Sequence, residues 1–216
     1  MSNFMSHSTS QSINHFSVEQ SVTYLKQDQS VLCVQLNHRF YLASRAYDQA
    51  GIELINQLKN RQEGRPLVLA FANLKAALNA QVNSPLLSLL PKFKGQLTVS
   101  VPSPPALPTP AHRGTGMIGV RLLDQPFMNE LLEDLQEPIV LSSANPIGQP
   151  AAQSIDMLHQ YQLSHLPLLL DPQAERVASK KHKATVITWV NSNLKLLAEG
   201  DLSLNTIQSE WEKLRQ

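Results

Sequence analysis

The stretch from Pro138 to Pro150 constrains the fold most, because a short apolar run leads there directly into a loop of small polar residues. Ile139-Val140-Leu141 is branched and uninterrupted, which predicts a buried strand. Ser142, Ser143 and Asn145 follow it, and then come two prolines and a glycine. In an open α/β sheet, a loop of this kind at the carboxyl end of a strand often holds a ligand. The same residues are common turn formers, so the local pattern also fits an ordinary strand-to-helix turn.

Apolar strands alternate with helical segments along the rest of the chain, which is typical of an α/β fold with a mixed sheet. Strands are predicted at 31–34, 67–71, 97–101, 117–122 and 166–170, and a hairpin at 184–190 and 194–197. Helices are predicted to begin with the capping box Ser17–Gln20 and at Asp48, and to cover 74–80, 84–90, 124–135, 154–163 and 205–214. The proline-rich segment 102–110 predicts a rigid extended crossing.

Length and composition indicate one globular domain over residues 17–216 behind a flexible, Ser/Asn/Gln-rich tail at 1–16. The net charge of +1 favours no particular partner, so any basic surface must be a local patch. The single cysteine, Cys33, lies in an apolar segment and is predicted to be a buried thiol. The histidines show no metal-binding spacing, and no apolar run is long enough to span a membrane. We therefore expect a cytoplasmic protein without a membrane partner.

Three basic residues, Lys59, Arg61 and Arg65, lie between the end of a predicted helix and the start of a strand. Such a group can clamp a polyphosphate or an RNA backbone. Cations at a helix C-terminus also complement the helix dipole, so a purely structural role fits as well. Arg113 and Arg121 are isolated in the sequence, and a second basic run at 179–183 fits a solvated loop.

The order and spacing of these motifs resemble the YrdC-like domain family, whose best-known members are the L-threonylcarbamoyladenylate synthases. The resemblance covers about residues 17–200. It rests on Lys59-Asn-Arg61 for Lys-x-Arg, on the Val-Arg-x-x-x-x-Pro stretch that contains Arg121, and on Pro138–Pro150 for Pro-x-x-x-Thr-Ser-Ala-Asn-x-Ser-Gly-x-Pro. It implies a twisted mixed sheet flanked by helices, with a basic cavity on the concave face.

The resemblance also implies roles at matched positions. Lys59, Arg61, Ser143 and Asn145 correspond to the family residues that line the nucleotide and substrate cavity, and Arg65 stands where a further basic residue is usual. Supporting positions are Ser142, Arg121, Thr98 and Thr185. Family chemistry uses threonine, bicarbonate and ATP, with Mg²⁺ normally accompanying the nucleotide: a carbamate forms on threonine and attacks the α-phosphorus, which releases pyrophosphate. The resemblance thus implies ATP or AMP as ligand, and RNA or tRNA-modification proteins as partners.

Several family residues are replaced. Gln35-Leu-Asn-His38 stands in place of Pro-Thr-Asp/Glu-Thr/Ala, and Tyr41 puts a ring where the family keeps a glycine. Ala198-Glu-Gly200 lacks the arginine of the family's Arg-x-Gly. Losing one buried hydrogen-bond partner typically costs about 1–3 kcal/mol. Three hypotheses therefore stay open: a divergent protein that binds a nucleotide or RNA, a working synthase with a rebuilt pocket, and a pseudoenzyme that acts as an interaction module.

Overall fold

The computed structural model describes residues 14–61, 64–172 and 183–215. Its strands are β1 (Leu32–Leu36), β2 (Arg39–Arg45), β3 (Val68–Phe71), β4 (Leu97–Pro102), β5 (Met117–Leu122), β6 (Ile139–Ser143), β7 (Leu168–Leu169), β8 (Thr185–Val190) and β9 (Asn193–Ala198). Its helices are α1 (Val18–Leu25), α2 (Gln49–Leu58), α3 (Leu74–Asn79), the 3₁₀-helix η1 (Pro85–Phe93), α4 (Thr109–His112), α5 (Pro126–Leu135), α6 (Ile155–Gln160) and α7 (Leu204–Leu214). No helix in the described part of the chain is long and apolar enough to cross a membrane.

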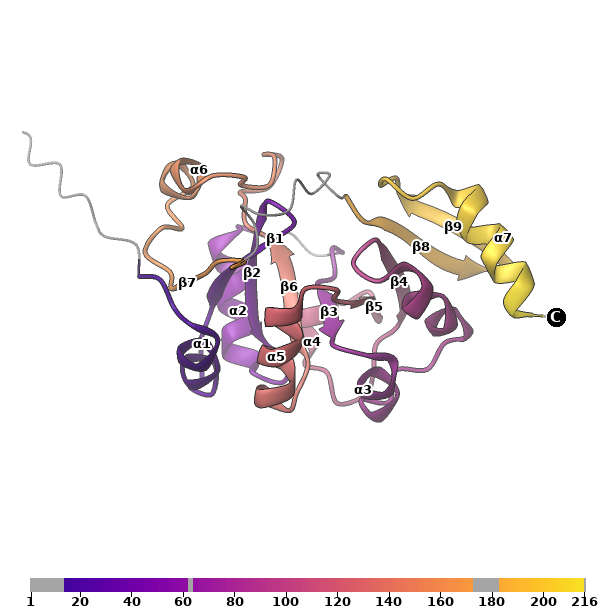
Figure 1. Ribbon diagram of the computed structural model, residues 1–216, viewed down its shortest axis with the longest axis horizontal. Coiled ribbons are helices and arrows are strands. Elements are labelled where there is room, and N and C mark those ends of the chain that lie inside the picture. The colour runs from indigo at the N-terminus through magenta and orange to yellow at the C-terminus, as the bar shows by residue number, and fades with distance from the viewer. Residues whose placement is uncertain (1–13, 62–63, 173–182, 216) are drawn as a thin grey trace, which may run out of the picture.

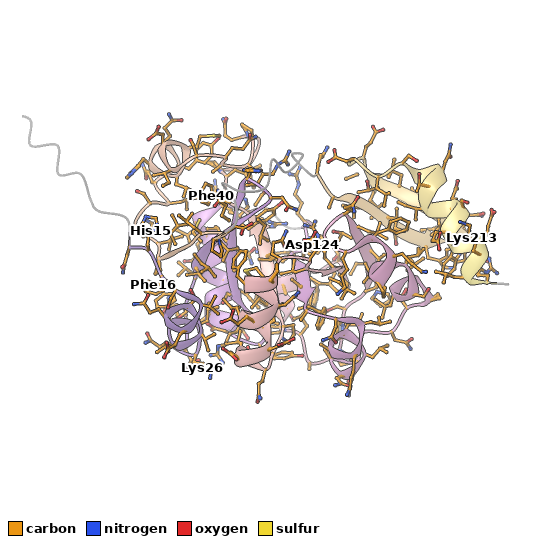
Figure 2. All side chains as sticks on the ribbon, viewed as in Figure 1. His15, Phe16, Lys26, Phe40, Asp124 and Lys213 are labelled. Carbon is orange, nitrogen blue, oxygen red and sulfur yellow. The ribbon has the colours of Figure 1, made fainter. Side chains whose placement is uncertain are left out.

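In the described residues, the strands form one nine-stranded sheet in the order β7-β1-β2-β6-β3-β5-β4-β8-β9 (Figure 1). Three pairs are parallel, β1·β7, β3·β5 and β4·β8, and the other five are antiparallel. This confirms the expected mixed sheet flanked by helices. Figure 2 shows the two ends of this sheet, with His15 and Phe16 beside β7 and Lys213 on α7.

Helices cover the two faces of the sheet and create two apolar cores. One core contains residues from α1 and α5, such as Leu25 and Met128, against Leu141 and its neighbours on one face. The larger core joins α2, η1 and α7 to the other face, with Ile55 and Phe71 among its fully buried side chains. Successive strand residues point to opposite faces, so β1, β2, β3, β6 and β7 contribute to both cores, whereas β4, β5 and β8 contribute buried residues to the larger core only.

Local signals explain where the helices begin. The predicted capping box is present, because the Ser17 hydroxyl accepts from the Gln20 amide while the Gln20 side chain accepts from Ser17 N–H. The Asp48 carboxylate accepts from the Gly51 amide at 3.0 Å and caps α2 as expected. Each cap satisfies N–H groups that the first helical turn leaves without a partner.

Two segments differ from their expected structure. The segment 102–110 is not an extended crossing, because Leu107 N–H donates to Pro104 O in a turn and α4 begins at Thr109. Proline also fits tight turns and the first turn of a helix. Residues 14–16 of the expected tail pair with β7 instead, since Phe16 N–H donates to Leu168 O at 2.9 Å. Residues 1–13 lie outside the described chain.

Candidate phosphate-binding site

Lys59 is the C-cap of α2 and reaches under the loop that follows β6. Its ammonium group donates to the carbonyl oxygen of Ser143, to the carbonyl oxygen of Asn145 at 2.8 Å and to Asn145 Oδ1 at 3.0 Å. A lysine has three donor hydrogens, so all of them are used by protein oxygens. Lys59 is buried at this position, with only 4% of its surface exposed.

This environment changes the protonation of Lys59. Burial lowers its pKa to about 7, and the positive charge of Arg61 lowers it further in the same direction. Its three accepting oxygens require the ammonium form, because a neutral amine has one donor fewer. Lys59 therefore holds the loop with a group that titrates near neutral pH.

Arg61 lies two residues beyond the helix end and ties the same region together. Its guanidinium donates to Ser142 Oγ at 2.7 Å, to Arg65 O at 2.8 Å and to Pro66 O at 2.8 Å. Burial and the nearby charges of Arg113 and Arg65 lower its pKa to about 10. Arg61 thus stays charged at neutral pH, with two of its five N–H groups not used in these hydrogen bonds.

Arg113 joins this group, which the sequence did not reveal. Its NH2 donates to the carbonyl oxygen of Arg61, and Gly64 N–H donates to Arg113 O at 3.3 Å. We call Arg61, Arg65 and Arg113 the arginine cluster. The signal that could have identified Arg113 is topological: β3 and β5 are parallel neighbours, so the segments preceding them meet at one edge of the sheet.

Hydrogen bonds within the loop after β6 fix its shape. Ser143 Oγ donates to Asn145 Oδ1 at 2.5 Å. The Asn145 amide donates to Pro146 O at 2.9 Å and to Gln149 O at 2.7 Å. Because Asn145 Oδ1 also accepts from Lys59, its side chain connects the loop to the end of α2. The loop is therefore preorganised by its own side chains.

Ser142 and Ser143 are consecutive in β6, so their side chains point to opposite faces of the sheet. Ser142 faces Arg61 on the α2 side. Ser143 faces the α5 side, where it lies directly opposite Tyr41 of β2. Directly opposed residues on antiparallel strands have side chains on the same face, in contact range. The ring that replaces the family glycine is therefore next to the Ser143 hydroxyl.

The replaced segment that begins at Gln35 forms a tight hairpin rather than an open loop. Asn37 and His38 connect β1 to β2 with φ values of 49° and 60°. This left-handed conformation suits the two central residues of a hairpin turn, and asparagine tolerates it well. Gln125 Nε2 donates to Asn37 Oδ1 at 2.8 Å and ties the turn to the start of α5.

Of the supporting residues, Ser142 lies in the site and accepts from Arg61, whereas Arg121, Thr98 and Thr185 lie elsewhere on the sheet. Arg121 Nε donates to Thr98 Oγ1 at 2.9 Å on the same face as the Ser143 side chain. The strand register separates Arg121 from Ser143 by four residues along the strands, about 13 Å, and by two strand spacings, about 10 Å. Thr185 is buried and donates to Leu202 O at 2.6 Å. These three residues are thus not part of the cluster around Lys59.

A groove of about 690 Å³ adjoins the arginine cluster between α2 and α4. Arg61 and Arg113 line it together with the amides of Asn56 and Asn60. In the described ranges, no group of three or more His, Cys, Asp or Glu side chains is placed to hold a metal ion. Most of the basic run at 179–183 lies outside the described residues; Lys183 N–H donates to Asp201 Oδ2 at 2.8 Å.

Comparisons with known proteins agree with this architecture. Threonylcarbamoyl-AMP synthase of Mus musculus is 27% identical over 143 residues, which are 66% of this chain and 51% of the relative. The chain thus spans about half the length of the curated relatives it matches. P. abyssi Sua5 complexed with L-threonine superposes with a TM-score of 0.75 at 19% identity, over 91% of this chain and 59% of that one. E. coli YciO superposes with a TM-score of 0.72 at 16% identity, over 90% of this chain and 97% of that one.

The structural neighbours at this level of identity show the fold. The family model does more, because it matches most of the chain, residues 27–200. That range contains β1 through β9 up to Gly200 and every residue of the arginine cluster. The chain therefore belongs to the Sua5/YciO/YrdC family, whose description is "Telomere recombination".

Proposed function

We propose that this chain binds a phosphate-bearing ligand, either a nucleotide such as ATP or AMP or the backbone of RNA, at the arginine cluster beside the Ser142–Asn145 loop. The observation that carries the proposal is the concentration of positive charge. Besides burial, the charges of Arg113 and Arg65 lower the pKa of Arg61, so both guanidiniums repel that of Arg61. Within the described residues, no carboxylate forms an ion pair with any of them. A bound phosphate would relieve this repulsion.

Unused donors are available in the cluster. Arg61 retains two N–H groups beyond its three hydrogen bonds, and Arg113 Nε is buried without a hydrogen-bond partner among the described residues. Arginine forks suit phosphate oxygens, and charge-assisted hydrogen bonds are about twice as strong as neutral ones. Arg61 and Arg113 are therefore the proposed contacts to phosphate.

Lys59 has a different role in this proposal. Its donors hold Ser143 and Asn145 from below, so it positions the loop instead of contacting the ligand. Mg²⁺ would arrive bound to the phosphates of ATP, because no group of three or more His, Cys, Asp or Glu side chains in the described ranges is placed to hold it. If the ligand is RNA, a tRNA-modification protein is a compatible partner, and the proposal assigns no surface of this chain to it.

L-Threonylcarbamoyladenylate synthesis is the second candidate function. What favours it is that the curated relatives are named threonylcarbamoyl-AMP synthases, and that a structural neighbour was solved with L-threonine. Two features argue against a complete synthase active site: the tight hairpin turn at Asn37-His38 and the ring of Tyr41 beside Ser143. We infer that this chain has kept the ability to bind phosphate even if it no longer carries out L-threonylcarbamoyladenylate synthesis.

The test measures AMP and ATP binding by calorimetry with wild-type protein and with Arg113→Gln. We expect Arg113→Gln to weaken binding about tenfold, in line with the loss of one charge-assisted hydrogen bond. Lys195→Gln, an exposed change on β9, is the matched control and should bind as wild type. Unchanged AMP, ATP and RNA affinity in Arg113→Gln would exclude the cluster and favour a pseudoenzyme that acts through another surface.

Two further measurements separate the ligands and the functions. Pyrophosphate release that requires both threonine and bicarbonate would show the synthase reaction. If RNA is the ligand, affinity should fall steeply with salt concentration, because counterions are released on binding. A nucleotide held by a few contacts gives a shallower dependence.

A further inference from the structure

A second cavity, of about 310 Å³, lies at the other end of the strands from the Ser142–Asn145 loop. β3 and β6 are antiparallel, with Ala70 opposite Ile139, so the carboxyl end of β3 meets the amino end of β6 there. The walls come from the end of β3, from α3 and from the last turn of α5 and the residues after it. This cavity is therefore separate from the arginine cluster.

One side of the cavity is apolar. Phe71, Ala72, Ala76, Leu132 and Pro138 contribute carbon surface to it. Phe71 and Leu132 are buried core residues, so this wall is fixed by packing on both sides of the sheet. It suits a short aliphatic chain, since contact there would remove apolar surface from water.

The other side is negatively charged. Glu133 and Glu137 line it, and the described residues of the lining include no lysine, arginine or histidine. Glu133 also lies in the last turn of α5, which contains no basic residue. The C-terminus of a helix carries partial negative charge and normally favours cations. The carboxylates and the helix end therefore add to one negative potential at the cavity.

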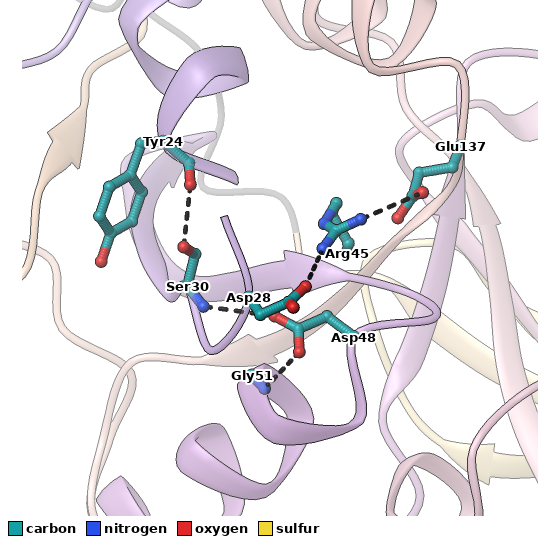
Figure 3. A network of polar contacts seen from close by, with 7 residues as sticks. All are labelled: Tyr24, Asp28, Ser30, Arg45, Asp48, Gly51 and Glu137. Carbon is teal, nitrogen blue, oxygen red and sulfur yellow. Dashed lines mark hydrogen bonds and ion pairs between the residues drawn. The ribbon is translucent and has the colours of Figure 1, made fainter. Parts of the chain in front are cut away.

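Arg45 neutralises this potential only in part. Its NH2 binds Asp28 Oδ1 at 2.8 Å, while its NH1 lies 3.8 Å from Glu137 Oε2 (Figure 3). Glu137 Oε1 is enclosed and has no hydrogen-bond partner within the described chain. Burial and the negative charge of Asp48 raise the pKa of Glu137 against the opposing effect of Arg45. One guanidinium is thus shared between two carboxylates, Asp28 and Glu137.

Tyr47 places an aromatic ring at the edge of the cavity, where it is 41% exposed. Burial and the charge of Glu137 raise the pKa of its phenol, so the hydroxyl stays neutral beside the carboxylate. Aromatic faces attract organic cations, with about 0.5–1 kcal/mol at exposed positions. The ring, the carboxylates and the helix end all favour the same kind of ligand.

We propose that this cavity is a binding site for a small organic cation, an ammonium or guanidinium group carried on a short aliphatic chain. The chain lies against the wall formed by Ala76 and Leu132, and the cationic group faces Glu133, Glu137 and the ring of Tyr47. The site is independent of phosphate binding at the arginine cluster, so either can fail without the other.

The test titrates the full-length protein with n-butylammonium chloride and with n-butanol, and follows amide chemical shifts by NMR. We expect butylammonium, but not butanol, to shift the amides of α3 and of the α5–β6 turn, with an affinity that falls as salt is added. Glu133→Gln should weaken butylammonium binding about threefold to fivefold. Asp134→Asn is the matched control, because it removes the same charge from the same helical turn without lining the cavity.

Tyr47→Leu provides an independent variant that keeps apolar bulk and removes the ring, and it should also weaken binding. Equal shifts with butanol would overturn the proposal and leave an apolar cavity without charge selectivity. Equal losses in Asp134→Asn and Glu133→Gln would overturn it as well, since only the general field of the helix end would then matter. No shift with either probe would leave the cavity as a gap in packing.

Discussion

The Nζ atom of Lys59 lies 2.8 Å from the carbonyl oxygen of Asn145 and 3.0 Å from its side-chain oxygen. This contact connects the end of α2 to the loop after β6 across 86 residues of sequence. A lysine that the resemblance assigns to a cavity-lining position therefore supports the loop from inside the protein.

Lys59→Ala should destabilise the protein by about 3 kcal/mol, because it leaves partly buried acceptor oxygens of Ser143 and Asn145 without their charged donor. Urea unfolding followed by circular dichroism measures the change. Lys75→Ala, on the exposed face of α3, is the control and should unfold at the wild-type midpoint. Equal midpoints for both variants would show that Lys59 contributes nothing to the loop.

The stability of the protein should depend on pH through Lys59. Its pKa is about 7 in the folded state and 10.5 for an ordinary lysine, so between these values the unfolded chain binds more protons. The contribution of Lys59 to the unfolding free energy therefore rises with pH across that window and is constant below it. Comparing wild type with Lys59→Met at several pH values isolates this slope. An identical pH dependence in both proteins would contradict it.

Tyr41→Ala should lower stability by about 2 kcal/mol, because the half-buried ring packs against the α1–α5 core. The same change removes the ring opposite Ser143 on the α5 side of the sheet, so we expect AMP affinity at the arginine cluster, on the α2 side, to stay unchanged. Tyr41→Phe keeps the ring and should preserve both stability and affinity. A change of AMP affinity in Tyr41→Ala would mean that the ligand reaches the α5 side beside Ser143.

Gly51→Ala should be strongly destabilising although Gly51 is in a helix. A Cβ there would lie 2.1 Å from Ser44 Oγ and 2.6 Å from Asp48 Oδ2, so the Asp48 cap must move. We expect a loss of about 2–3 kcal/mol in chemical denaturation. Gly114→Ala has open space around it but a φ of 75°, and should cost only about 1 kcal/mol. The reverse order would show that backbone strain outweighs the close contact.

Much of the fold could be predicted from the sequence, because its signals are local. The β5 bounds at Met117 and Leu122 match those expected, and the caps at Ser17 and Asp48 are confirmed. The strand expected at 166–170 contains only Leu168–Leu169, since β7 is an edge strand held by a short parallel pairing with β1. Strand length at a sheet edge depends on the neighbour rather than on the strand itself.

The candidate site could be predicted only in part. The sequence identified Lys59, Arg61 and Asn145, which the structure brings together. It could not show that Lys59 is buried, since helix-end lysines are usually exposed. It also missed Arg113, because its proximity to Arg61 depends on the parallel pairing of β3 with β5, a long-range property of the sheet.

The position of β8 and β9 at the end of the chain affects how the protein folds during synthesis. β8 joins the main sheet by parallel pairing with β4, and Thr188 Oγ1 donates to Ser100 O at 3.0 Å across 88 residues. Parallel pairing over such a separation forms slowly, because loop closure precedes any stabilising contact. During synthesis, this edge of β4 therefore stays unpaired until β8 has left the ribosome, and an unpaired strand edge of a nascent chain is prone to aggregation.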